Sequence, residues 1–305
     1  MKKVYSSLVG LLVCFFPVYA LAYAGQSIEM VNIDKSSLGP AAMTVGEVMS
    51  QWKKLPPAES SRTAYNITDE GPSSAVLIMG AANSPGAFGS YFTTDLYAVN
   101  PHATGQPTIT VTVFAVLNGV DYSVNNPPSG SFKLQPRQCA ILKNIGQMLG
   151  VSGGFTLLMG ASTSSFSAWS YTSTPGQVGG RYGVNIHGVG GNYQDWLYDG
   201  WNVGAEVSGA ARTNFAIFNL NSTSLTINVS VYSSAGGSPV ATIPVVVPPY
   251  GCVQKSLATY VPSLSDGTLW FVYGSGGGSS ADYVSYMVVN DNVTNDANFQ
   301  LSTGW

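Results

Sequence analysis

The sequence predicts an all-β protein made of two tandem antiparallel β-sandwich domains of the immunoglobulin-like type. Short runs of β-branched and aromatic residues, bounded by Gly, Pro and Asn, follow one another from Ser74 onward. No helical periodicity of useful length interrupts them, apart from a turn at LKNIGQMLG. The pattern of the first half recurs in the second half, which is typical of a duplicated domain.

The first 24 residues have the features of an export signal. Lys2 and Lys3 form the positive start, the apolar run LVGLLVCFFPV follows, and ALAYA offers small-residue cleavage sites. The apolar run is too short to span a bilayer, and no later run is long enough. We therefore expect an exported bacterial protein, periplasmic, extracellular or on the cell surface, with no transmembrane segment in the mature chain.

The amino-acid composition limits the kinds of molecule that the protein is expected to bind. Charged residues make up 9% of the chain, against about 25% in an average soluble protein. Without Lys2 and Lys3, 12 − 2 = 10 basic residues oppose 15 acidic ones, a net charge of −5. Nucleic acid is excluded as a partner, because it calls for a clustered basic surface. A hydrophobic fraction of 45% excludes disorder for the body of the chain.

Residues 25–70 are expected to form an N-terminal arm instead of a domain. Within it, MTVGEVMSQWKK (43–54) predicts one short amphipathic helix, with Thr44 as N-cap and Glu47 at the capping-box position. The paired prolines of LPPAESS end this helix. The first sandwich is then expected over residues 71–187 and the second over 188–305.

Four segments of the two halves correspond, at offsets between 113 and 119 residues. A duplication of one domain explains this similarity. The matched segments are residues 94–100 with 213–219, 110–113 with 226–229, 134–145 with 247–258 (placing Cys139 over Cys252), and Ser170-Tyr171 with Ser285-Tyr286.

The order TDLxxxN, TVTV, LxP and SY, closed by DNxTxD, resembles a β-sandwich repeat of secreted bacterial proteins. That repeat often stands in tandem beside proteases or other surface modules, and it has no assigned activity. The resemblance covers about residues 74–302. It implies a sandwich fold and a noncatalytic accessory role, and it implies no substrate.

Two cysteines remain after signal removal, Cys139 and Cys252. An even pair in an oxidising compartment allows one disulfide. The alternative is two buried thiols in different domains, because spacing alone does not bring two Cα atoms to the required ~6 Å.

No constellation of catalytic residues stands out, and we expect no enzyme. His102 and His187 lie in loops, and neither accompanies further metal ligands at a suitable spacing. The G-x-S-x-G at Ser152 leads into a strand, whereas a nucleophile elbow joins a strand to a helix. Acidic residues are few and stand mostly at turns, where Asp is favoured for local hydrogen bonding.

The strongest binding candidate is NYQDWLYDGW, residues 192–201. Aromatic rings interleaved with amides and carboxylates are the mixture that sugar recognition needs, since rings stack on C–H surfaces and polar groups bind hydroxyls. The alternative is that these rings pack at the domain junction. The candidate ligand contacts are Tyr193, Asp195, Trp196, Tyr198, Asp199 and Trp201.

The segment VVNDNVTNDANFQ, residues 288–300, resembles a chemical site most closely. Asp291, Asn295 and Asp296 could offer oxygens to calcium, although the EF-hand pattern is absent. Asn and Asp also favour tight strand exits, and the resembled repeat closes in this element. A structural turn and a calcium site therefore both stay open, and calcium is the one cofactor considered.

We expect a noncatalytic interaction module that binds an extracellular glycan or a surface protein. The first alternative is a structural subunit that self-associates through β-strand edges on the cell surface. The second is an outer-membrane β-barrel, prompted by Phe299, Leu301 and Trp305 near the C-terminus.

Overall fold

A computed structural model describes residues 27–52, 73–86, 89–162, 164–176, 179–190, 199–273 and 283–304. This part of the chain is mostly β-strand in several sheets, which confirms the all-β prediction. The export signal and most of the segment 192–201 lie outside the described residues.

The strands of the first half belong to one ten-stranded sheet, with the order β1-β6-β3-β2-β7-β4-β5 and with β8, β9 and β10 attached to β3, β8 and β2. β1 joins β6 in parallel, and the other pairs are antiparallel. The elements are β1 (Glu29–Asn32), η1 (Lys35–Ser37), α1 (Val45–Gln51), β2 (Ala75–Pro85), β3 (Tyr91–Val99), β4 (Ile109–Leu117), β5 (Ser129–Leu134), β6 (Gln138–Leu142), α2 (Ile145–Leu149), β7 (Gly153–Ala161), β8 (Ser167–Pro175), β9 (Arg181–His187) and β10 (Val189–Gly190).

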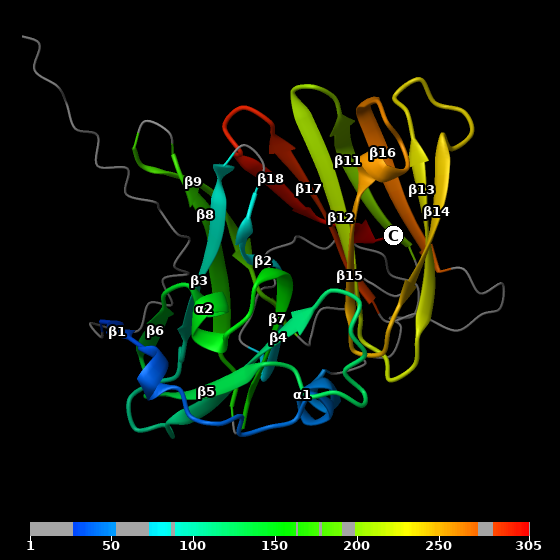
Figure 1. Ribbon diagram of the computed structural model, residues 1–305. Helices are drawn as coiled ribbons and strands as arrows, with labels where there is room; N and C mark the ends of the chain where they lie inside the picture. Colours follow the sequence, from blue (N-terminus) through cyan, green and yellow to red (C-terminus); the bar gives the residue numbers. More distant parts are fainter. Residues whose placement is uncertain are drawn as a thin grey trace, which may run out of the picture.

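The second half forms two sheets, β14-β13-β16-β11-β19 and β15-β12-β17-β18. The first of these sheets lies at the right of Figure 1, and the second lies nearer the centre, between it and the strands of the first half. The elements are β11 (Asp199–Val207), β12 (Ala211–Asn219), β13 (Leu225–Tyr232), β14 (Ala241–Val247), β15 (Cys252–Ser256), η3 (Leu257–Thr259), β16 (Leu264–Tyr273), β17 (Tyr283–Asp291), β18 (Ala297–Leu301) and β19 (Thr303–Gly304).

Eight strands of each half pair in the same order. The series β5-β4-β7-β2 corresponds to β14-β13-β16-β11, and β6-β3-β8-β9 corresponds to β15-β12-β17-β18. The predicted similarity of the halves therefore extends to their hydrogen-bonded ladders. Cys139 lies opposite Val99 and Cys252 opposite Phe218, so the two cysteines occupy equivalent positions.

One correspondence from the sequence is shifted by two residues. Thr94 lies opposite Thr172, and its counterpart Thr213 lies opposite Val289. The offset between β8 and β17 in the ladder is therefore 289 − 172 = 117, and Ser170 corresponds to Met287 instead of Ser285. A two-residue shift keeps the same face of a strand, so the sequence comparison still assigned the faces correctly.

Both halves also share a bulge and the contact beside it. Gly80 in β2 and Gly204 in β11 have φ values of 83° and 81°, and the register shifts at each of them. Two residues beyond each glycine, a buried threonine of the next strand bonds the backbone. The Thr94 hydroxyl accepts from Ala82 N at 2.8 Å, and the Thr213 hydroxyl accepts from Glu206 N at 2.8 Å.

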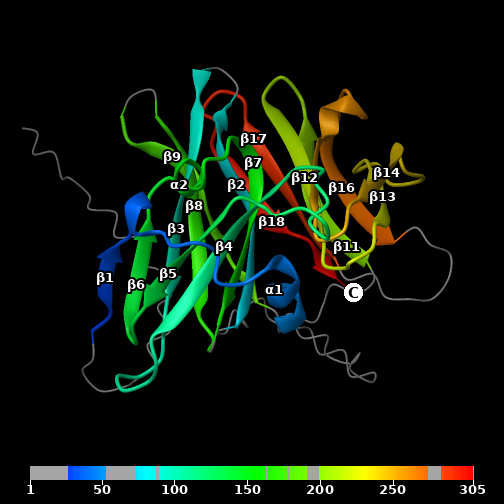
Figure 2. The same cartoon turned by 60° about the horizontal axis from the view of Figure 1, so that its bottom comes forward.

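The sheets lie in four layers with three hydrophobic clusters between them (Figures 1 and 2). The first cluster lies between the two series of the first half, and the second lies between the two sheets of the second half. The third cluster lies between the halves, where β2, β4 and β7 face β12, β15 and β17. The outward faces of β6-β3-β8-β9 and of β14-β13-β16-β11 are thus left at opposite ends of the molecule.

The N-terminal arm closes one side of this arrangement. α1 begins after Thr44, and the predicted capping box is present, because the Thr44 side chain bonds Glu47 N and the Glu47 carboxylate bonds Thr44 N. Val48 and Trp52 of this segment join the cluster between the halves. β1 adds to the edge of β6, a pairing that the sequence analysis did not predict.

Candidate functional site

Only part of the predicted aromatic segment can be placed. Tyr193, Asp195, Trp196 and Tyr198 lie outside the described residues. Trp201 and the backbone of Asp199 lie on β11, where Trp201 is opposite Trp270 of β16 and Asp199 is opposite Val272.

The two tryptophans stand on the outward face of the sheet β14-β13-β16-β11. Their rings stack with centroids 4.7 Å apart and planes inclined by 6°. Tyr232 of β13 lies 6.3 Å from Trp270 in a tilted arrangement. All three side chains are partly exposed, whereas the alternate residues Leu269 and Phe271 are fully buried. We call this surface, defined by Trp201, Trp270 and Tyr232, the tryptophan face.

Polar uncharged residues surround these rings. Ser230 lies opposite Trp270, and Thr268 lies opposite both Tyr232 and Val203. Val203 itself is 62% exposed. Hydroxyl groups beside large exposed rings can bind the hydroxyls of a ligand that covers those rings. The face is therefore chemically suited to a polar, uncharged molecule with C–H surfaces.

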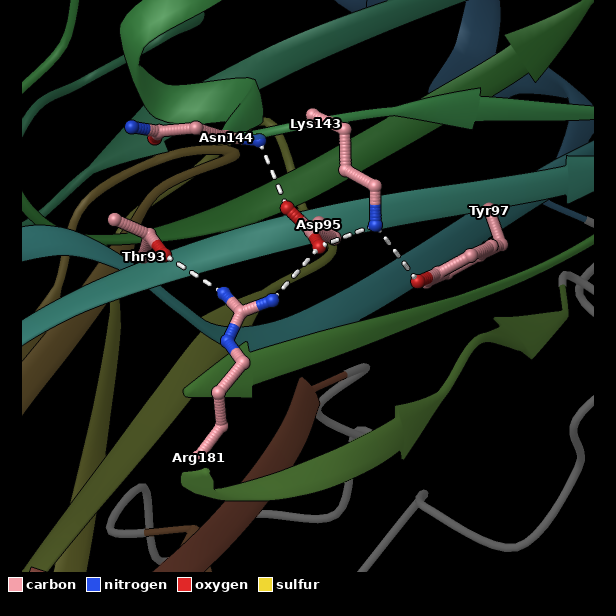
Figure 3. Close-up of polar contacts among 6 residues, drawn as sticks. All are labelled: Thr93, Asp95, Tyr97, Lys143, Asn144 and Arg181. Atoms are coloured by element: carbon pink, nitrogen blue, oxygen red, sulfur yellow. Dashed lines mark hydrogen bonds and ion pairs between the residues drawn. The ribbon is translucent and has the colours of Figure 1, made fainter. Parts of the chain in front are cut away.

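A second surface lies at the other end of the molecule, on the outward face of β6-β3-β8-β9. Figure 3 shows the polar contacts of its central residues. At its centre is Asp95, whose side chain is only 4% exposed. One carboxylate oxygen accepts from Asn144 N at 2.9 Å. The other lies 2.8 Å from Lys143 Nζ and 3.5 Å from Arg181 Nη1. We call this surface, centred on Asp95, Lys143 and Arg181, the charged face.

Aromatic rings lie beside these charges. Tyr97 and Trp169 stack with centroids 5.5 Å apart and planes inclined by 3°. Lys143 Nζ lies 5.6 Å from the Tyr97 ring centroid, and the Arg181 guanidinium lies 5.7 Å from that of Tyr171. The hydrogen bond to Asp95 is the main reason that the pKa of Lys143 is raised. Lys143 therefore stays charged across the physiological range.

The sequence analysis did not select this surface, although a signal was present. In YFTTDLYAV and SAWSYTS, the alternate positions Asp95, Tyr97, Trp169 and Tyr171 are polar or aromatic, and the residues between them are small or apolar. Such alternation is typical of a strand with one solvent-facing side. The alternation did not reveal the ion-pair partners of Asp95, because Lys143 and Arg181 come from distant segments of the chain.

The Asp/Asn segment is a tight turn between β17 and β18, with its oxygens engaged in local bonds. Asp291 Oδ1 accepts from Val293 N and Thr294 N, at 2.8 and 2.6 Å. Mainly through the bond from Thr294, these contacts lower the pKa of Asp291. Asp296 Oδ1 accepts from Ala297 N at 3.0 Å. The DNxTxD sequence thus closes the strand by hydrogen bonds to its own backbone.

Arg212 of β12 also holds this turn. Its Nη1 donates to Asn292 Oδ1 and its Nη2 to Asn295 Oδ1, each at 2.8 Å. The Arg212 guanidinium therefore already binds the Asn295 oxygen, a candidate calcium ligand. Across the described ranges, no group of three His, Cys, Asp or Glu side chains could hold a metal ion. The geometry favours the turn over calcium.

Both cysteines, the candidates for a disulfide, are free and buried. Burial raises the pKa of each thiol to about 11. Cys252 Sγ lies in the contact between the halves, where it accepts from the Thr156 hydroxyl at 3.3 Å. Protonated, buried thiols are inert as nucleophiles.

A serine hydroxyl lies close to the His102 ring, with Ser164 Oγ 2.7 Å from Nε2. The same nitrogen lies 2.9 Å from the carbonyl of Ser165. If Nε2 carries the proton to bond that carbonyl, it cannot accept the serine proton as a base. Ser152 lies just before β7, as the sequence predicted, and not at a strand-to-helix turn.

A scan against protein-family models found no match, and searches of curated proteins and of solved structures found none either. Within the described residues, no helix is both long and apolar enough to cross a membrane. The two outward faces, with their aromatic and charged side chains, are therefore the candidate functional sites.

Proposed function

We propose that the chain is a noncatalytic, exported binding module of two tandem immunoglobulin-like β-sandwich domains, and that its tryptophan face binds an uncharged glycan. The matching strand order of the halves supports the tandem-domain interpretation. The stacked Trp201–Trp270 pair is the observation that carries the ligand assignment. Two indoles held on a rigid sheet offer large contact area with little entropy to lose on binding.

The groups around the indoles favour a sugar over an apolar partner. Ser230 and Thr268 supply hydroxyls beside the rings, and Asn228 adds an amide opposite Val272. Each of these groups can both donate and accept, which matches the hydroxyls of a saccharide. A purely apolar partner would leave these groups buried without hydrogen bonds, at a cost of about 1–3 kcal/mol each.

The sheet edges give less support to assembly through strand addition. Gly39 exchanges two backbone hydrogen bonds with Ser131 at the edge strand β5, and β1 covers the edge strand β6. At β15, Asn118 forms a bridge with Cys252. The edge strand β14 contains Pro244, which has no N–H to donate. Covered and proline-bearing edges oppose pairing with a further chain.

Glycan binding can be tested with the mature chain and a panel of neutral polysaccharides, by affinity electrophoresis and calorimetry. We expect Trp201→Ala and Trp270→Ala each to weaken binding about tenfold, since one ring contributes about 0.5–1.5 kcal/mol beyond its buried area. Tyr91→Ala is the matched control, because Tyr91 is an exposed ring in the first half, 46% accessible. Undiminished binding by both tryptophan variants, or no binding to any polysaccharide, would overturn the proposal.

A further inference from the structure

We propose that the charged face is a second binding site, specific for an acidic saccharide. Its carboxylate or sulfate group would bridge Lys143 and Arg181, and its ring would cover Tyr97 and Trp169. This site lies at the opposite end of the molecule from the tryptophan face, and the inference does not rest on the function proposed for that face.

The first argument is the charge balance. Two cations share one carboxylate, so the cluster carries a net charge of +1. Among the described residues, Asp95 is the one carboxylate within 4.0 Å of either cation. The Asp95 side chain is 4% exposed, whereas those of Lys143 and Arg181 are 60% and 45% exposed. The negative Asp95 carboxylate is thus buried beneath the two cations, and the positive groups of Lys143 and Arg181 face the solvent.

The second argument is the hydrogen-bonding capacity that remains. The Arg181 guanidinium contacts Asp95 and the Thr93 hydroxyl, each at 3.5 Å. Lys143 Nζ bonds Asp95 at 2.8 Å and meets the Tyr97 hydroxyl only at 3.5 Å. A guanidinium has five N–H donors and an ammonium three, so both groups can still donate to a ligand. The planar fork of arginine suits a carboxylate or a sulfate.

The third argument is the position of the rings. Tyr97 of β3 and Trp169 of β8 are ladder neighbours, and Tyr171 lies opposite Asp95. The rings therefore share one face with the cations, on adjacent strands. Exposed Asn185 and His187 of β9 continue the same face beyond Tyr171 and Trp169. A cation pair beside an aromatic platform with a polar border matches a ligand that is both anionic and ring-shaped.

The fourth argument is that the fold does not need this cluster. In the equivalent sheet of the second half, Asn214 replaces Asp95, Ser256 replaces Lys143 and Ala216 replaces Tyr97, at matched ladder positions. The sheet forms there without charges at these three positions. A buried carboxylate is costly unless it is paired, and replacing such a pair by neutral residues is often neutral for stability. The charges are thus better explained by a ligand than by the fold.

The test is calorimetric titration of the mature chain with an oligogalacturonate, a uronic-acid saccharide, and separately with a neutral galactan oligosaccharide. We expect the oligogalacturonate to bind and the neutral sugar to bind at least tenfold more weakly at this site. Lys143→Gln and Arg181→Gln should each weaken uronate binding about tenfold, because a hydrogen bond to a charged group contributes about 1.5–3 kcal/mol. Arg181→Lys should recover part of the loss, since it keeps the charge and loses the fork.

Two controls separate this site from general charge effects and from the tryptophan face. Lys133→Gln removes an exposed lysine of β5, on the other series of the first half, and should leave uronate binding unchanged. Trp270→Ala should also leave it unchanged. Circular dichroism and melting temperature verify that each variant is folded.

Three results would overturn the inference. The first is equal affinity of the Trp270→Ala variant for uronate and neutral sugar, and the second is unchanged uronate binding by both glutamine variants. The third is competition by inorganic sulfate at the same concentration as the saccharide, which would reduce the site to a general anion site. Loss of neutral-glycan binding by Trp201→Ala would concern the tryptophan face alone.

Discussion

The sheet β6-β3-β8-β9 and its counterpart β15-β12-β17-β18 have the same strand order, yet their outward faces meet different surroundings. In the first half this face holds the Asp95 cluster (Figure 3), in which the Lys143 and Arg181 side chains are exposed to solvent. In the second half it packs against β2, β4 and β7 of the first half. The inward faces of both sheets are apolar.

The difference is visible position by position along the ladders. Tyr97, Val99, Trp169, Tyr171, Asn185 and His187 of the first half correspond to Ala216, Phe218, Tyr286, Val288, Phe299 and Leu301 of the second. Tyr97, Tyr171, Asn185 and His187 are thus replaced by apolar residues where the halves meet. The inward face fixes the fold, and the outward face of each copy is free to acquire its own partner.

The largest expected effect tests this division directly. Phe218 is fully buried between the halves, and its counterpart Val99 is partly exposed on the charged face. We expect Phe218→Ala to lower the free energy of unfolding by about 3–5 kcal/mol. Val99→Ala should cost less than about 1 kcal/mol, because little cavity is left. Urea denaturation measures both, and similar losses would mean that the outward faces are not distinct.

A second comparison concerns what the halves share. Thr94 and Thr213 are buried, and each bonds the backbone beside its bulge. Replacing either by Val leaves a backbone N–H and C=O without that hydroxyl, which should cost about 1–3 kcal/mol. We expect losses of similar size in the two halves, measured by thermal denaturation. A loss of stability in only one of the two variants would argue against a shared structural role for these threonines.

The bulge glycines sharpen the comparison further. Both have positive φ, so an alanine at either position is strained by about 1–2 kcal/mol. A Cβ on Gly204 meets nothing within 4 Å, whereas one on Gly80 would lie 3.0 Å from Ile186 Cδ1 and 3.2 Å from Phe299 Cε2. Gly80→Ala should therefore destabilise more than Gly204→Ala. Equal melting temperatures for the two variants would contradict this role of the contact between halves.

The smallest effect is expected at the turn of the second half. The folded-state pKa of Asp291 lies below the ordinary value of 3.8, so its ionised form stabilises the fold above that value. This contribution is lost as the pH falls below 3.8 through the lower folded-state pKa. Melting temperatures from about pH 6 down to about pH 2 should fall less steeply for Asp291→Asn than for the unmodified chain. If the melting temperatures of the two proteins fell in parallel with pH, the ionised Asp291 side chain would have no role in stability.

Much of the layered arrangement is readable from the sequence in retrospect. AVLIM in β2 is a continuous apolar run because Val76 and Ile78 enter one cluster while Leu77 and Met79 enter another. Strands covered on both faces have this pattern. ATIPVVV in β14 alternates buried and exposed residues, since its outer side meets solvent. The short helix, the repeat and the closing turn were predicted from local signals.

Other features depend on contacts that no local pattern encodes. Asp95 meets Lys143, 48 residues away, and Arg181 comes from a further strand. The parallel addition of β1 to β6 and the stacking of the halves likewise join segments far apart in the chain. Of the predicted aromatic site, Trp201 alone could be placed with its side chain, and its ring partner Trp270 was not foreseen.

The two equivalent cysteines have a practical consequence. Each half contains one protonated thiol that is shielded from solvent, Cys139 on β6 beside the arm strand β1 and Cys252 in the contact between the halves. A thiol reagent can reach either sulfur only when its surroundings open. The rate at which a reagent modifies Cys252 therefore reports how often the halves separate. The rate for Cys139 reports how often the edge where β1 pairs with β6 opens.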